Sequence, residues 1–189
     1  MGFPKDSAHT AQRRARFEKP TSIFDLANFC VSEFIGVSGA LVTRICEGEF
    51  GVTREAWQLL AMLVHLGEMS PSALAAATTI DQSQLSKSLK VLCDKELVYR
   101  KVVSTDRRRA MVGATPAGHD LYHRIFPRVM KVHDKVLEGF SEADKVQLSG
   151  YLHAMHRNAS NAFDSMLQGS VANRRRPAST RRPPPLATP

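Results

Sequence analysis

The chain has 189 residues, of which 43% are apolar, and a formal net charge of +8, values typical of one folded domain with charged tails. No uninterrupted apolar run reaches the roughly 18 residues that a membrane span needs, and the N-terminus lacks the apolar stretch of a secretory signal. We therefore expect a cytoplasmic protein with no membrane partner, and three widely spaced cysteines argue against a disulfide framework or a zinc ribbon.

The positive charge is concentrated at the two ends of the chain. Residues 1–20 carry a net charge of +3 and residues 171–189 carry +5, so the body of the chain, residues 21–170, is neutral overall. Within this body, residues 81–109 hold eight basic and four acidic side chains, a net charge of +4. We predict a flexible basic arm over residues 1–20 and a disordered Arg/Pro-rich tail over residues 170–189. The basic segment of the body favours a nucleic-acid partner.

The first predicted element is a long helix over residues 22–47. Its apolar positions form a broad surface: Ile23, Leu26, Phe29, Cys30, Phe34, Val37, Leu41 and Ile45. So few polar positions indicate burial on more than one side, and the simplest partner is a second copy of the chain. Thr53 then caps a second helix, predicted over residues 54–66.

A short helix, a turn and another helix follow from residue 70. Ser70 and Pro71 are an N-cap followed by proline at the first helical position. Asp81 caps the next helix, and Gln84 lies three residues further on, as in a capping box. Three leucines then share one face of this helix, Leu85, Leu89 and Leu92.

The opposite face of the same helix combines short polar side chains with two cations. Its members are Ser83, Gln84, Ser86, Lys87 and Lys90. Short side chains let a helix approach base edges, and lysines reach phosphates or guanine. Taken alone, the pattern fits an ordinary solvated helix face equally well, but the segments around it favour a helix that reads DNA.

Two short, partly β-branched runs, residues 98–103 and 110–114, are suited to strands joined by a basic loop. The loop contains three consecutive arginines, residues 107–109, and an arginine at a hairpin tip suits contact with the DNA backbone or minor groove. Asp106 can hold a neighbouring arginine by a charge-assisted hydrogen bond. A helix-turn-helix followed by such a hairpin predicts a mainly α protein with a small β wing, the winged helix-turn-helix.

Two further helices complete the prediction. Thr115 and Pro116 open a helix that we expect to reach about Phe140, with Pro127 inside it as a source of bending. Ser141 caps a last helix, whose first turn carries acidic residues as the helix dipole favours.

The segment around the basic loop resembles the MarR family of transcription regulators. The matching positions are the Asp-x-Arg pair of the wing, the Thr-Pro-x-Gly start of the following helix and an upstream Gly-Val-Thr-x-x-x-Trp stretch: Asp106, Arg108, Thr115, Pro116, Gly118 and residues 51–57. The resemblance covers about residues 22–167 and is strongest over residues 74–118. One departure is residues 94–96, where many members of the family have a glycine turn.

The resemblance implies a dimer, with about six helices and a two- or three-stranded hairpin per chain in a domain over residues 21–169. The winged helix-turn-helix would span about residues 53–115, and helices over residues 22–47 and 116–168 would form the dimer. Two recognition helices would enter successive major grooves of a pseudo-palindromic double-stranded DNA operator. The expected DNA contacts are Ser83, Gln84, Ser86, Lys87, Lys90, Asp106, Arg107 and Arg108.

The family also implies a pocket for a small aromatic carboxylate, whose binding would release a repressor from its operator. The candidate lining residues are Phe34, Ser38, Arg44, Trp57, Met62, His65 and Met111. Arg44 or His65 can meet a carboxylate, and Trp57 or Phe34 can flank a ring. Trp57, Phe34 and Met62 are equally compatible with ordinary core positions.

Two alternatives stay open on the same fold. One is a thiol-based redox sensor that uses Cys30, Cys46 or Cys93, and the other is a ligand-independent DNA binder driven by the basic tails.

Metal binding and catalysis are not expected. Two histidine pairs have helical spacing but no obvious third ligand, so we predict surface histidines: His119 with His123, and His153 with His156. No nucleophile elbow or Gly-rich phosphate loop occurs, so the sequence predicts neither an enzyme nor a cofactor.

Overall fold

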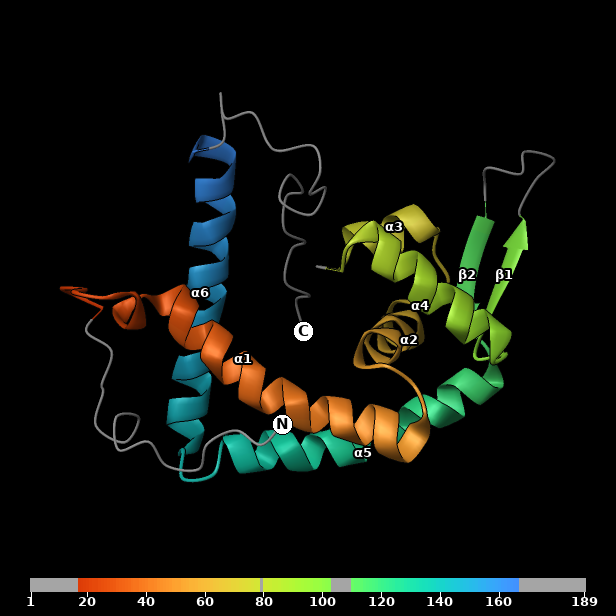
Figure 1. Ribbon diagram of the computed structural model, residues 1–189, viewed down its shortest axis with the longest axis horizontal. Helices are drawn as coiled ribbons and strands as arrows, with labels where there is room; N and C mark the ends of the chain where they lie inside the picture. The colour runs from red at the N-terminus through yellow and green to blue at the C-terminus, as the bar shows by residue number, and fades with distance from the viewer. Residues whose placement is uncertain (1–16, 79, 103–109, 167–189) are drawn as a thin grey trace. The chain divides into compact units, whose positions relative to one another are not determined.

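A computed structural model describes residues 17–78, 80–102 and 110–166, the side chains as far as residue 162. Six α-helices and one antiparallel hairpin make up this part of the chain, together with one 3-10 turn and one π-helical turn (Figure 1). The chain divides into two compact units, Met1–Val42 and Thr43–Pro189, which are described separately. The prediction of a mainly α protein with a small β wing is confirmed.

The first unit contains most of α1 (Ala27–Arg44), preceded by the 3-10 turn η1 (Ile23–Asp25). The prediction of one helix starting at residue 22 is therefore wrong. The Asp25 carboxylate accepts hydrogen bonds from the Thr21 and Ser22 amides at 3.0 and 3.1 Å and closes a separate turn. Leu26 then has extended backbone angles, φ −83° and ψ 130°, and α1 begins only after it.

The helix that starts in α1 continues as the π-turn η2 (Ile45–Glu49). The span Ala27–Glu49 has 23 residues and a mean hydropathy of 1.5, which is long and apolar enough for a membrane-spanning helix. Core helices of soluble proteins and signal sequences pass the same test, and polar and charged residues interrupt this span, so it contains no uninterrupted apolar run of about 18 residues. On α1, four large apolar side chains are exposed, namely Phe34, Ile35, Val37 and Leu41.

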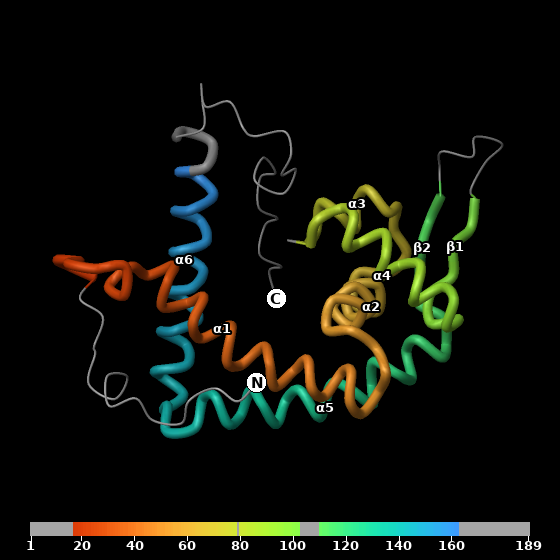
Figure 2. Tube along the Cα trace, viewed as in Figure 1, coloured from red at the N-terminus to blue at the C-terminus, as the bar shows by residue number. Residues whose placement is uncertain are grey.

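The second unit is organised around α2 (Arg54–Leu66), whose predicted bounds and Thr53 cap are confirmed. α2 contacts η2, α4 (Gln82–Asp94), α5 (Pro116–Val136) and β2 (Ala110–Ala114). Figure 2 shows α2 next to α4. It contributes three fully buried leucines, Leu59, Leu60 and Leu63. Burial of each leucine is worth about 1.5–3 kcal/mol, so this helix holds the neighbouring elements together.

The helix-turn-helix and hairpin have the predicted order. Ser70 caps α3 (Pro71–Ala76), which precedes α4. Strand β1 (Val98–Val102) pairs antiparallel with β2, and a single bridge between Met69 and Val112 adds a third segment beside β2. This arrangement confirms the winged helix-turn-helix.

The turn between α4 and β1 has the geometry that a glycine would favour. Glu96 has a φ of +57°, in the left-handed region. The amide of Leu97 donates to the Leu92 carbonyl and the amide of Glu96 to the Cys93 carbonyl, both at 2.9 Å, which is the Schellman pattern of helix ends. Residues 94–96 therefore form the same kind of turn that many members of the family make with glycine, although Glu96 holds the left-handed position.

The start of α5 is joined to this turn. The Thr115 hydroxyl donates to the Glu96 carbonyl at 2.7 Å, and it also accepts from the Gly118 amide as the helix cap. A Cβ atom at Gly118 would overlap the Leu97 carbonyl oxygen, so only glycine permits this approach.

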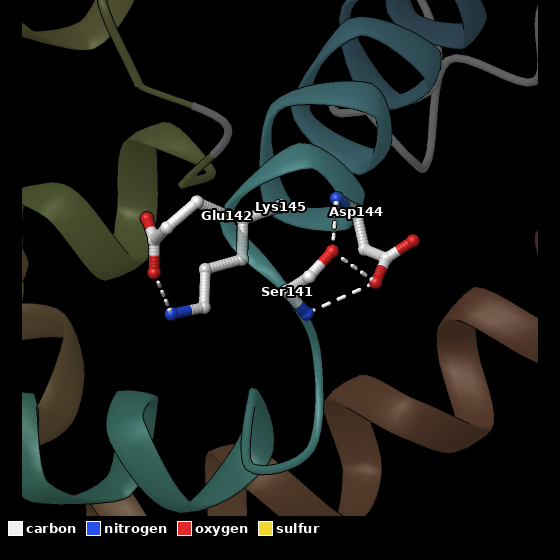
Figure 3. A network of polar contacts seen from close by, with 4 residues as sticks. All are labelled: Ser141, Glu142, Asp144 and Lys145. Atoms are coloured by element: carbon white, nitrogen blue, oxygen red, sulfur yellow. Dashed lines mark hydrogen bonds and ion pairs between the residues drawn. The ribbon is translucent and has the colours of Figure 1, made fainter.

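α5 contains Pro127 and ends at Val136, earlier than the predicted end near Phe140. Gly139, with a φ of +87°, lies in the turn that separates it from α6 (Glu142–Met166). Ser141 caps α6 as predicted, because its hydroxyl accepts from the Asp144 amide and the Asp144 carboxylate accepts from the Ser141 amide (Figure 3). The Ser141 hydroxyl also donates to the Asp144 carboxylate at 2.6 Å, and this bond, followed by that from the Ser141 amide, lowers the pKa of Asp144.

Replacing Glu96 by Gly should stabilise the protein. A left-handed non-glycine residue costs about 1–2 kcal/mol and glycine in place of it loses about 0.5–1 kcal/mol of chain entropy, so we expect a gain of roughly 0.5–1 kcal/mol. Chemical denaturation of the two proteins measures this gain. The matched control is Lys95→Gly, at a neighbouring residue with a φ of −92°, which should not stabilise. Equal or lower stability of Glu96→Gly would contradict the strain at this turn.

Candidate nucleic-acid interface

The candidate recognition helix α4 is fixed at its start by Asp81. The Asp81 carboxylate accepts hydrogen bonds from the Ser83 and Gln84 amides at 2.8 and 3.0 Å. The bond from the Gln84 amide, followed by that from the Ser83 hydroxyl, holds the pKa of Asp81 below its usual value. The cap therefore stays ionised at neutral pH and favours the positive end of the helix dipole.

The two faces of α4 are divided as the sequence predicts. Leu85, Leu89 and Leu92 are buried, and Ser88, which the sequence analysis did not single out, is buried with them at 4% exposure. The outer face carries the predicted polar residues: Ser83, Ser86, Lys87 and Lys90 are exposed, and Gln84 is half-buried. A helix held by one apolar face thus presents short polar side chains on the other.

The hydroxyls of the two exposed serines both donate hydrogen bonds to acceptors on α4 or its cap. Ser83 Oγ donates to the Asp81 carboxylate at 2.7 Å, and Ser86 Oγ donates to the Gln82 carbonyl at 2.8 Å. In this arrangement each hydroxyl has acceptor lone pairs left for an outside group. Such an acceptor suits the amino group of adenine or cytosine in a major groove.

The two lysines differ in their surroundings. Lys90 Nζ lies 2.8 Å from an Asp94 carboxylate oxygen, one helical turn further on. Lys87 is exposed and makes no ion pair within the part of the chain that the structure describes. Lys87 is therefore the readier cation for a phosphate or a guanine, whereas Lys90 would first have to leave Asp94.

The predicted wing residues Asp106, Arg107 and Arg108 lie outside the described residues. The structure describes the two strands that they connect, up to Val102 on one side and from Ala110 on the other.

A cleft of about 670 Å³ lies among the start of α3, the start of α4 and the hairpin. Its walls include Ser70, Ser72, Gln82, Ser86, Arg100 and Met111. Arg100 was missed by the sequence analysis, although strand alternation places it on the face opposite Tyr99 and Lys101. Met111, predicted for the effector pocket, lies in this cleft beside the recognition helix.

The other predicted effector residues are spread over both units. Phe34 and Ser38 belong to the first unit, where the Ser38 hydroxyl donates to the Phe34 carbonyl at 2.9 Å. Arg44 is exposed at the end of α1, and Met62 is half-buried on α2.

Trp57 and His65, both on α2, have more specific surroundings. Trp57 Nε1 is buried and has no hydrogen-bond partner among the described residues. His65 Nε2 lies 2.6 Å from the hydroxyl of Tyr122 on α5, and the two rings meet edge to face. Burial raises the pKa of Tyr122, so its hydroxyl remains a neutral hydrogen-bonding group. Tyr122 is a residue that the sequence analysis missed.

The cysteine environments bear on the redox alternative. Cys46 is fully buried, and burial, followed by the neighbouring Glu47 charge, raises its pKa to about 11. Burial also raises the pKa of Cys93, and the Cys30 thiol donates to the Phe24 carbonyl at 3.3 Å. A thiol with a raised pKa is a poor nucleophile, so Cys46 and Cys93 do not have the environment of a sensor.

The described residues contain no group of three or more His, Cys, Asp or Glu side chains that could hold a metal ion. His119 and His123 are exposed on α5, and the His153 and His156 side chains are half-buried on α6.

Comparison with known proteins agrees with this geometry. The family model described as "MarR family" matches residues 50–109. The chain is 33% identical over 110 residues to a protein of Thauera aromatica named as a transcriptional regulatory protein for its hcr operon; the match covers 58% of this chain and 66% of that protein.

Solved structures show the same fold. A MarR-family transcriptional regulator from Silicibacter pomeroyi superimposes with a TM-score of 0.61 and 23% identity, over 81% of this chain and 95% of that one. BpsR of Bordetella bronchiseptica, whose DNA binding is described as regulated by 6-hydroxynicotinic acid, gives 0.64 and 20% identity, over 72% of this chain and 97% of that one.

The described elements thus define a winged helix-turn-helix protein, with one long helix, α1, before this segment in the chain and two, α5 and α6, after it. With the family match over residues 50–109, which include the helix-turn-helix and the first strand of the wing, the chain belongs to the MarR family of transcriptional regulators.

The two lysines of α4 should contribute unequally to DNA binding. Lys87→Ala should weaken binding to a specific duplex by about 1–3 kcal/mol if Lys87 reads a base, or reduce the salt slope by about 1 if it meets a phosphate. Lys90→Ala should have a smaller effect, because Asp94 already neutralises Lys90. Fluorescence anisotropy titrations at several salt concentrations measure both effects. Wild-type binding by Lys87→Ala would contradict a DNA contact of Lys87, and wild-type binding by Arg108→Ala as well would refute the assignment of this interface.

Proposed function

We propose that the protein is a homodimeric, ligand-responsive transcription regulator that binds double-stranded DNA through α4. The observation that carries this proposal is the division of α4 into a buried leucine face and an exposed face of serines and lysines. Ser83, Gln84, Ser86 and Lys87 would face the major groove. The wing residues Arg107 and Arg108 would contact the flanking backbone or minor groove, which attracts arginine, and Asp106 would hold a neighbouring arginine in place.

Dimerisation would cover the apolar surfaces of the long helices. α1 exposes Phe34, Ile35, Val37 and Leu41, and α6 exposes Val146, Tyr151, Leu152 and Met155. Apolar surface of this kind is unfavourable in water, and a second copy of the chain covers it symmetrically. Such a dimer places two α4 helices on successive major grooves, which suits a pseudo-palindromic operator. We take this self-association, in the cytoplasm, as the reason for the apolar character of Ala27–Glu49.

The effector we propose is a small aromatic carboxylate that releases a repressor from DNA. Support comes from BpsR, for which an aromatic acid is named as the regulator of DNA binding. In this chain, Trp57 Nε1, which has no hydrogen-bond partner in the described part of the chain, and the His65–Tyr122 pair offer hydrogen-bonding groups beside aromatic rings. Phe34, Ser38, Arg44, Met62 and Met111 remain candidate contacts. An effector that binds one dimer geometry better changes the spacing of the recognition helices and hence the affinity for DNA.

The alternative of a redox sensor has less support, since burial raises the pKa of both Cys46 and Cys93. Trimming residues 1–20 and 171–189 tests the alternative that the basic tails drive DNA binding. Sequence-specific binding that persists in the trimmed protein rules it out.

Arg108→Ala should weaken operator binding and leave the dimer intact. The loss of one minor-groove or phosphate contact is expected to cost about 1–3 kcal/mol. A gel shift with a duplex that the wild-type protein selects from a random-sequence pool measures the affinity, and sedimentation measures the dimer. Arg128→Ala is the control, because Arg128 lies on α5 and pairs with Glu49 through hydrogen bonds of 2.7 and 2.8 Å. Equal affinity of both variants would contradict the wing contact.

An aromatic carboxylate that binds the native protein should raise its melting temperature, since ligand binding to the folded state alone stabilises it. We expect a thermal-shift screen of aromatic acids to yield at least one stabilising compound whose effect is reduced by Trp57→Phe, which keeps the ring and removes Nε1. The same compound should weaken DNA binding. A stabilising compound that leaves DNA affinity unchanged would contradict its role as an effector.

A further inference from the structure

A polar cluster ties the hairpin to the segment between α2 and α3. Glu68 Oε2 accepts a hydrogen bond from the Tyr99 hydroxyl at 2.7 Å and lies 2.7 Å from Lys101 Nζ. Tyr99 and Lys101 are two residues apart on β1 and therefore share one face of the strand. Their partner, Glu68, precedes Met69, which pairs with Val112 in β2 through amide–carbonyl bonds of 3.0 and 2.8 Å.

The cluster crosses β2 because β2 has a glycine at the crossing point. Tyr99 lies opposite Gly113 in the register of the hairpin. A Cβ atom at Gly113 would overlap the Tyr99 ring and hydroxyl, so the ring occupies the space that a side chain would fill. Glycine inside a strand commonly marks such a close approach. Glu68 thereby reaches β1, the outer strand, from the far side of β2.

The directions of the pKa shifts of Glu68, Tyr99 and Lys101 agree with these contacts. The hydrogen bond from Lys101, followed by that from Tyr99, lowers the pKa of Glu68, and hydrogen bonding to Glu68 raises the pKa values of Tyr99 and Lys101. Lys101 Nζ also lies 5.9 Å from the centre of the Tyr99 ring. All three groups are partly exposed, so the cluster is unnecessary for burying the core and contributes little to overall stability.

We propose that Glu68 is a positioning residue for DNA binding, which sets the direction of β1 through Tyr99 and Lys101 and so aims the basic wing; this rests on the proposed function. A hairpin of two strands is marginally stable by itself, and its orientation depends on what holds it to the body. β1 packs on the body with Val98 buried, whereas its remaining four side chains are exposed. Among the described residues, the tie to Glu68 is therefore a specific side-chain contact that holds the outer part of the strand, in addition to its pairing with β2.

A simpler role for Glu68 predicts the opposite change in DNA affinity when Glu68 is removed. If Glu68 only neutralises Lys101, its removal would free a cation near DNA, raise the affinity and steepen the dependence on salt. Positioning predicts that removal lowers the affinity and flattens the salt dependence, because phosphate contacts of the wing are lost.

The test measures the affinity of the full-length protein for a duplex that the wild-type chain selects from a random-sequence pool. We expect Glu68→Ala to weaken binding about tenfold and Tyr99→Phe about threefold, in line with loss of hydrogen bonds to a charged group. Glu68→Gln, which keeps an acceptor for Tyr99, should recover part of the loss. The matched control is Glu138→Ala, which removes an exposed carboxylate paired with a lysine, Lys135, at 3.1 Å, and should change the affinity less than about twofold.

A double-mutant cycle separates positioning from general damage. In a background that lacks both Arg107 and Arg108 side chains, Glu68→Ala should lower the DNA affinity less than about twofold, because the arginines whose direction Glu68 would set are then absent. The same tenfold loss in that background, or a higher affinity of Glu68→Ala with a steeper salt slope, would overturn the proposal. A wild-type chain that selects no duplex refutes the proposed function, whereas equal affinities of Glu68→Ala and Glu138→Ala refute this inference alone.

Discussion

The burial of one leucine face of α4 against α2 is the interaction on which the rest of the second unit depends. Leu85, Leu89 and Leu92 are buried, and at about 1.5–3 kcal/mol each they outweigh any single polar contact on the outer face. Because a helix has 3.6 residues per turn, burying these positions leaves Ser83, Ser86 and Lys87 outside. The polar face thus follows from the packing of the opposite face, and the Asp81 cap fixes where this helix begins.

The features that sequence predicts well here are those determined by neighbours along the chain. The caps at Thr53, Ser70, Asp81, Thr115 and Ser141 are hydrogen bonds over two or three residues, and all five were predicted. Periodicity likewise identified the buried face of α4. The helix expected from residue 22 failed for an equally local reason, since the Asp25 carboxylate closes a 3-10 turn ahead of α1.

Contacts between distant residues were beyond that reasoning. His65 meets Tyr122 across 57 positions, and Glu68 meets Tyr99 across 31, and neither pair has a spacing that a pattern could detect. Arg100 escaped notice because its position depends on how the hairpin faces α3 and α4. Lys90 shows the reverse case, because its pairing with Asp94 at i, i+4 was readable in the sequence and changes which lysine is available.

The joint between α4, the hairpin and α5 constrains how an effector could act under the proposed function. Gly118 brings α5 against the Leu97 carbonyl, and Thr115 donates to the Glu96 carbonyl, so the start of α5 has no room to slide along this turn. Close-packed contacts of this kind shift between discrete arrangements and resist gradual deformation. An effector that alters DNA affinity would therefore move α4, the hairpin and the start of α5 together. The effector would change the distance between the recognition helices of the two copies in a dimer, while the recognition surface of each copy stays intact.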